Sequence, residues 1–136
     1  MRSLSRKRRA PAWLPPANRQ TDHFAQRVTG LFQEGVSLQN TGHPEKALRI
    51  FHRVARELER AGIDDASIYG AIGYANLMLG ESDNAIEYSN TALGIDPNFV
   101  KALINISAAY RLQEKYDEAF EYAQKAHDLD PQNAQS

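Results

Sequence analysis

The chain has 136 residues, no cysteine and a net charge of −1. This length allows one domain or a short repeat array, and the lack of cysteine excludes a disulfide framework and a thiolate metal site. Residues 1–20 carry a charge of +6 and residues 21–136 a charge of −7, so a basic arm precedes an acidic domain. No run of about 18 apolar residues is present, and we therefore expect no membrane-spanning helix.

Residues 1–21 are predicted to be a disordered basic arm. Three prolines between residues 11 and 16 interrupt any helix there, and the composition is polar and strongly charged. The arm leaves two further readings open: an organellar or nuclear targeting signal in an otherwise cytoplasmic protein, or contact with nucleic acid or an anionic lipid surface. The organellar reading depends on the arginine-rich, acid-free composition, and the others depend on four consecutive basic residues, Arg6, Lys7, Arg8 and Arg9. Trp13-Leu14, the only apolar pair, could also dock in the domain's own groove.

From residue 22 onward the pattern is helical. Apolar residues recur at helical spacing between clusters of Gly, Pro, Asn and Asp, which predicts six helices near 22–40, 44–61, 65–79, 82–94, 98–113 and 116–129. No segment alternates with a period of two residues, so no strand is predicted. Asp64 or Asp65 is the expected N-cap of the third helix, and Asp83 that of the fourth.

An internal repeat of 34 residues relates 66–97 to 100–131. Nine of the 32 aligned positions are identical, whereas chance gives about two, and a fixed period of this length indicates a solenoid of helix pairs. Gly73, Ser107, Ala85 and Ala119 are small, which predicts that the two helices of a pair cross closely there. The Asp-Pro pairs at 96–97 and 130–131 are expected to end the second helix of their repeats.

At these positions the chain resembles the tetratricopeptide repeat (TPR) family. The third repeat carries the family's pattern in Leu103, Ile106, Ser107, Tyr110, Ala119, Ala123, Ala126 and Pro131. The second carries it in Tyr69, Ile72, Gly73, Ala85, Ala92 and Pro97, but departs from it at Asn76 and Ser89. The first supplies Leu31, Gly35, Leu38, Ala47, Phe51 and Val54, with Glu34 at a position that is usually apolar.

The resemblance implies an all-α fold, a right-handed α-solenoid of three helix-turn-helix repeats. These span about 28–61, 66–99 and 100–133, within a domain of residues 22–131 that is followed by a polar tail, 132–136. Ala47 and Ala85 occupy the same repeat position 38 residues apart. The four extra residues are expected to lengthen the second helix of the first repeat through residues 56–61.

The resemblance also implies a concave groove, lined by the first helix of each repeat. We expect its apolar side chains to contact an apolar or amphipathic partner segment and its polar side chains to fix that segment's position. The candidate groove residues are Phe32, Gln33, Val36, Gln39, Asn40, Ala71, Tyr74, Leu77, Met78, Lys101, Ile104, Asn105, Ala108, Arg111 and Leu112. The alternative is that some of them pack between neighbouring helices of the groove.

Some family members bind the C-terminal carboxylates of chaperones through a clamp of lysine, arginine and asparagine. The five clamp positions hold Phe32, Val36, Ala71, Lys101 and Asn105, and only Lys101 matches. A dicarboxylate needs several converging donors. A chaperone tail is therefore not the expected partner.

No catalytic, cofactor or metal site is expected. The four histidines lie on different helices and turns without paired spacing, and neither a glycine-rich phosphate loop nor a serine elbow is present. The chain is thus predicted to be a non-enzymatic adaptor that binds a partner peptide or helix in the groove. The alternatives are a small chaperone or assembly factor that holds a client segment, and nucleic-acid or anionic-surface association through the arm. Self-association through the aromatic residues of the last helix also stays open.

Overall fold

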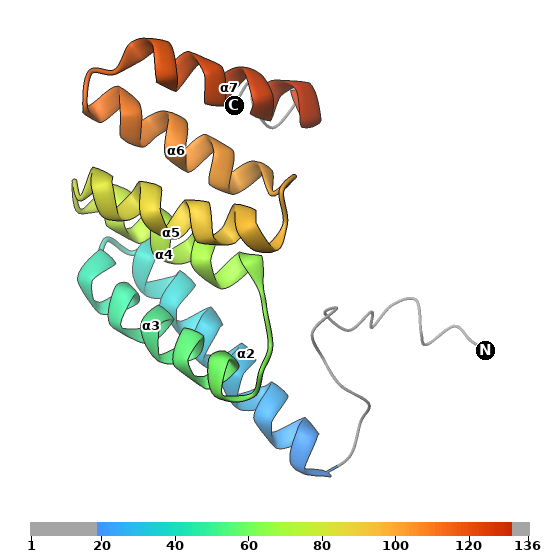
Figure 1. Cartoon of the computed structure of the whole chain (residues 1–136). Coiled ribbons are helices and arrows are strands. Elements are labelled where there is room, and N and C mark those ends of the chain that lie inside the picture. Colours follow the sequence, from blue (N-terminus) through green and yellow to red (C-terminus); the bar gives the residue numbers. More distant parts are fainter. Residues whose placement is uncertain (1–18, 132–136) are drawn as a thin grey trace.

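The computed structural model of the protein describes residues 19–131, and it describes their side chains from residue 23 onward. Six helices form this part of the chain: α2 (Arg19–Asn40), α3 (Pro44–Arg60), α4 (Ala66–Met78), α5 (Ser82–Ile95), α6 (Val100–Leu112) and α7 (Tyr116–Leu129). Figure 1 shows them stacked in chain order, from α2 and α3 at one end to α7 at the other. None of the described helices is both long enough and apolar enough to cross a membrane.

The six predicted helices and the absence of strands from residues 19–131 are confirmed. Successive helices pair as α2–α3, α4–α5 and α6–α7, and each pair packs on the next, which is the predicted solenoid of three helix-turn-helix repeats. Helix α2 begins at Arg19, three residues before the predicted start. The predictions for the arm up to residue 18 and for the tail 132–136 lie outside the described residues.

Small residues let the two helices of each pair approach, as predicted. A Cβ built on Gly73 would collide with the Ser89 hydroxyl and lie 3.2 Å from the Ala85 carbonyl oxygen, so α4 and α5 cross at this point. In the next pair the Ser107 hydroxyl donates a 2.7 Å hydrogen bond to the Ala119 carbonyl. Larger side chains at these crossings would push the helices apart.

The helix ends confirm most of the predicted boundaries. Asp65 is the N-cap of α4, where its carboxylate accepts a 3.1 Å bond from the Ser67 amide. The prediction for Asp83 is wrong: the N-cap of α5 is Glu81, without a side-chain bond, and Asp83 instead accepts a 2.6 Å bond from Gln113 Nε2. The expected extension of the first repeat is present, since α3 has 17 residues while α5 and α7 have 14.

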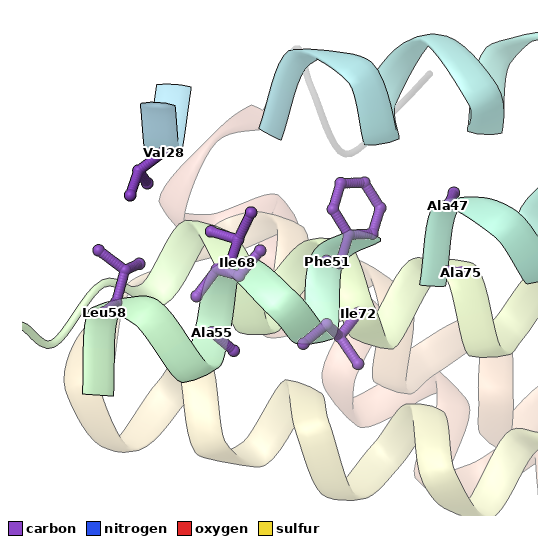
Figure 2. Close-up of a cluster of buried hydrophobic side chains, with 9 residues drawn as sticks. Val28, Ala47, Phe51, Ala55, Leu58, Ile68, Ile72 and Ala75 are labelled. Atoms are coloured by element: carbon purple, nitrogen blue, oxygen red, sulfur yellow. The ribbon is translucent and has the colours of Figure 1, made fainter. Parts of the chain in front are cut away.

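The apolar core is concentrated in the first two repeats. Figure 2 shows Phe51, Leu58, Ile68 and Ile72 gathered between α2, α3 and α4. At the far end, α7 buries only alanines, Ala119 and Ala126. Hydrophobic stabilisation scales with buried apolar area, so the array is held most firmly around α3 and α4.

Candidate partner-binding groove

The first helices of the repeats, α2, α4 and α6, carry the candidate groove residues. Helix α6 packs against α4 as well as against α5, so the first helices of the second and third repeats lie side by side. Seven of the fifteen candidates are exposed: Gln33, Asn40, Tyr74, Met78, Lys101, Arg111 and Leu112. Seven more are half-buried: Phe32, Val36, Gln39, Ala71, Leu77, Ile104 and Ala108.

Three of the exposed candidates are large and apolar. Tyr74 is 44% exposed, Met78 42% and Leu112 57%. A single large apolar side chain on the surface of a protein is common. A group of them on adjacent helices is typical of an interaction surface. The core does not depend on these side chains, because buried neighbours such as Ile72, Ala75 and Ile106 fill the space between the helices.

The expectation that Asn105 is a polar contact in the groove requires correction. Asn105 is 5% exposed, and its Nδ2 donates a 3.0 Å hydrogen bond to the Gly70 carbonyl. A buried amide has to find such a partner, because leaving it unpaired is costly. Asn105 therefore joins α6 to α4, as the alternative of packing between neighbouring helices anticipated.

The junction between α4 and α6 is closed. Gly70 has no side chain to separate the helices, and a Cβ added there would lie 2.6 Å from the Phe99 ring. The same repeat positions at the junction of α2 and α4 hold Phe32 and Ala71 in place of Gly70 and Asn105. Phe32 packs on Phe51, with ring centroids 5.6 Å apart. Helices α2 and α4 contact each other less than α4 and α6 do, as expected where a bulky ring occupies this position and no amide bonds across.

A pocket of about 520 Å³ lies at this open junction, and we call it the α2–α4 pocket. Its large apolar side chains come from α2, α3, the start of α4, the end of α5 and the turn before α6: Val28, Phe32, Val54, Leu58, Ile68, Ile95 and Phe99. Three carboxylates, of Asp64, Asp65 and Asp96, also line it, and none of the described lysines or arginines does. Sequence reasoning missed this pocket, although the contrast between Phe32 and Gly70 was a usable signal.

Two family models described as tetratricopeptide repeat match residues 66–99 and 100–133. Together with the helix pairs and the small residues at their crossings, these matches decide the family. The chain belongs to the tetratricopeptide repeat family.

A curated relative supports the same assignment over most of the chain. The photosystem I assembly protein Ycf3 of Rippkaea orientalis is 30% identical over an alignment of 132 residues. The match covers 87% of this chain and 73% of that protein.

Solved TPR structures share the fold. MamA from Desulfovibrio magneticus RS-1 matches with a TM-score of 0.66 at 24% identity; the match covers 76% of this chain but only 56% of the MamA chain. The second TPR domain of human RPAP3, in complex with an HSP70 peptide, matches with a TM-score of 0.68 at 18% identity, covering 79% of this chain and 87% of that one. At such identities the likeness shows the fold alone.

Polar contacts brace the wall of the α2–α4 pocket. Arg27 forms a 3.0 Å ion pair with Glu57, and this hydrogen bond lowers the pKa of the Glu57 carboxyl. The Tyr69 hydroxyl donates a 2.8 Å bond to Glu59; burial, together with this carboxylate, raises the pKa of Tyr69 to about 12. These contacts tie the end of α3 to α2 on one side and to α4 on the other, which fixes the walls of the pocket.

The described residues contain no group of three or more His, Asp or Glu side chains that could hold a metal ion. His52 packs edge-on against Tyr88, with ring centroids 5.5 Å apart, and burial lowers its pKa. Its surroundings, a tyrosine ring and the nearby Arg56, are those of a packing residue.

Proposed function

We propose that this TPR protein is a non-enzymatic adaptor that binds a partner peptide or helix along α2, α4 and α6. The observation that carries the proposal is the exposure of Tyr74, Met78 and Leu112 on the helices that the family uses for binding. Amphipathic segments dock in apolar grooves by burying side chains of this kind. Aromatic residues and methionine are also enriched at protein interfaces.

The expected partner has apolar anchors and at least one acidic group. Lys101 and Arg111 are exposed in the first and last turns of α6, and both are cations on the helix that also carries Leu112. They can form charge-assisted hydrogen bonds to carboxylates. The RPAP3 domain with its HSP70 peptide supports peptide binding by this fold, but Phe32, Val36 and the engaged amide of Asn105 do not offer a carboxylate clamp.

A second candidate is an assembly factor that holds a client segment. It is favoured by the relative named photosystem I assembly protein Ycf3, which matches over most of this chain. The same groove would serve both functions, and the identity of the captured partner distinguishes them. Association with nucleic acid or anionic lipid through Arg6–Arg9 stays a prediction, since this run lies outside the described residues. A cytoplasmic location also stays a prediction.

The test is capture of partners by the full chain and by a Tyr74→Ala/Met78→Ala double variant. Both side chains are exposed, so the free energy of unfolding should change by no more than about 0.5 kcal/mol. Interface hot spots contribute about 1–2 kcal/mol or more each, so affinity should fall roughly 30-fold or more. Titration of the captured partner against both proteins measures this loss.

Phe120→Ala is the matched control. Phe120 is 67% exposed and lies on α7, outside the groove, so its removal deletes a comparable exposed ring. The control should bind as the unmodified chain does. Equal capture by the double variant and the unmodified chain would contradict the proposal, and loss in Phe120→Ala alone would move the binding surface to α7.

A further inference from the structure

The N-terminal arm joins the described fold at the start of α2, the helix that forms one wall of the α2–α4 pocket. Helix α2 has 22 residues against 13 in α4 and α6, and Figure 1 shows its first turns projecting past the end of the stack. Val28, the first buried residue among the described side chains of α2, is also a wall of the pocket. The arm therefore joins the fold nine residues before the pocket, on the helix that forms one of its walls.

The lengths agree. Arg19 and Val28 lie about 14 Å apart along the helix axis. Leu14 is five residues before Arg19, and Pro15-Pro16 favour an extended chain of about 3.1 Å per residue, which spans about 16 Å. An arm that turns back along α2 thus brings Trp13 and Leu14 beside Val28 and Phe32.

The side chains of the arm also match those that line the pocket. The pocket has apolar walls, and Trp13-Leu14 is the only apolar pair in the arm. Among the described residues, no lysine or arginine lines the pocket with its three aspartates, and Arg27 on α2 is paired with Glu57. The arm supplies the opposite charge in the run Arg6–Arg9 and contains no acid before residue 20. Charge complementarity of this kind selects and orients a docking segment.

We propose that Trp13 and Leu14 of the same chain occupy the α2–α4 pocket, with the run Arg6–Arg9 beside Asp64, Asp65 and Asp96. Phe32 is at once a pocket wall and a groove residue, so the docked arm covers one end of the groove. This consequence for partner binding rests on the proposed function, whereas occupancy of the pocket does not.

Trp13 is the only tryptophan of the chain, so intrinsic fluorescence reports its surroundings directly. In the full chain its emission should lie at shorter wavelength, and acrylamide should quench it less, than in a synthetic peptide of residues 1–18. Thr29→Arg adds bulk and positive charge at an exposed pocket residue and should shift the emission to that of the peptide. Thr91→Arg, at an exposed threonine of α5 outside the pocket, should change nothing.

Three results would overturn this proposal. Peptide-like emission in the unmodified chain would leave the pocket to a separate partner. Shielded emission that Thr29→Arg does not alter would place Trp13 elsewhere. Emission that changes with protein concentration, together with a dimeric mass in sedimentation, would assign the arm to the pocket of a second copy. The Tyr74→Ala/Met78→Ala variant should keep the unmodified emission, so failure of the groove function and failure of this proposal are separable.

Discussion

Gly73 shows how a single missing side chain determines the distance between two helices. Its Cα faces the Ser89 hydroxyl, the Ala85 carbonyl and, at 3.3 Å from an added Cβ, the Asn105 amide. The Ala85 carbonyl belongs to the backbone, and the Asn105 amide is held by its bond to the Gly70 carbonyl, so neither can simply rotate away. Gly30, on an open face of α2, has nothing within 4 Å of an added Cβ. The same substitution at the two glycines therefore has opposite consequences.

Gly73→Ala should lower the free energy of unfolding by about 1–3 kcal/mol, because α4 and α5 must separate to admit a methyl group. Gly30→Ala should raise it by about 0.5–1 kcal/mol, because alanine restricts the unfolded chain and favours a helix. Chemical denaturation followed by circular dichroism measures both. If Gly73→Ala were as stable as Gly30→Ala, the close crossing of α4 and α5 would be disproved.

Residues whose role is set by a repeat position could be predicted from the sequence. Gly73, Ser107 and Ala85 follow from the need for close helix crossings, and all three lie at crossings. Asn105 could not be assigned in the same way. Its repeat position faces the groove, but whether it reaches water depends on Gly70, 35 residues earlier, and on how closely α6 approaches α4.

At the scale of the element, the start of α4 depends on one side chain. The first amides of a helix lack partners within the helix, and the Asp65 carboxylate satisfies that of Ser67. The starts of α3, α5, α6 and α7 have no side-chain cap, so α4 is the helix for which a cap can be tested. This helix also contributes Ile68 and Ile72 to the main core.

Asp65→Ala should destabilise the protein by about 1 kcal/mol, the usual cost of losing an N-cap. Asp64→Ala is the matched control, since it removes the same charge one residue earlier without removing the cap. Thermal unfolding of the two variants side by side gives the difference. Equal melting temperatures would show that the Asp65 bond contributes nothing beyond its charge.

Helix positions were predictable to within about three residues because clusters of turn residues and prolines separate the helices. The extra turn of α3 was also predictable, from the 38-residue spacing. The wrong N-cap of α5 has a physical cause: Asp83 lies inside the first turn, where Gln113 from the following repeat competes for its carboxylate. The contrast between Phe32 and Gly70 indicates a wider junction between α2 and α4, but the position of Phe99, which closes the pocket from the turn before α6, could not be predicted from the sequence.

At the scale of the whole molecule, stability is unevenly distributed along the array. Phe51, Ser89 and Ala123 occupy equivalent positions in the second helices of the three repeats. The first two are fully buried, while Ala123 is exposed. Helix α4 buries seven residues and α7 two. In a solenoid each repeat contacts only its neighbours, so such differences remain local.

Amide hydrogen exchange should therefore be faster in α7 than in α4. Helix α7 can open by itself, at a free energy below that of global unfolding, and we expect its slowest amides to exchange at least about 10-fold faster than those of α4, a difference of about 1.4 kcal/mol. Mass spectrometry of peptides covering the two helices measures this. Equal protection would mean that the array unfolds as one unit.

The uneven core has a consequence for the order in which the chain folds during synthesis. Domains acquire structure from the N-terminus as the ribosome adds about 5–20 residues per second. Phe51, Ile68 and Ile72 all precede residue 73, so the residues that make the main apolar core leave the ribosome before α6 and α7 do. The first two repeats then present a finished surface on which α6 can form, with the Gly70 carbonyl already in place to receive Asn105.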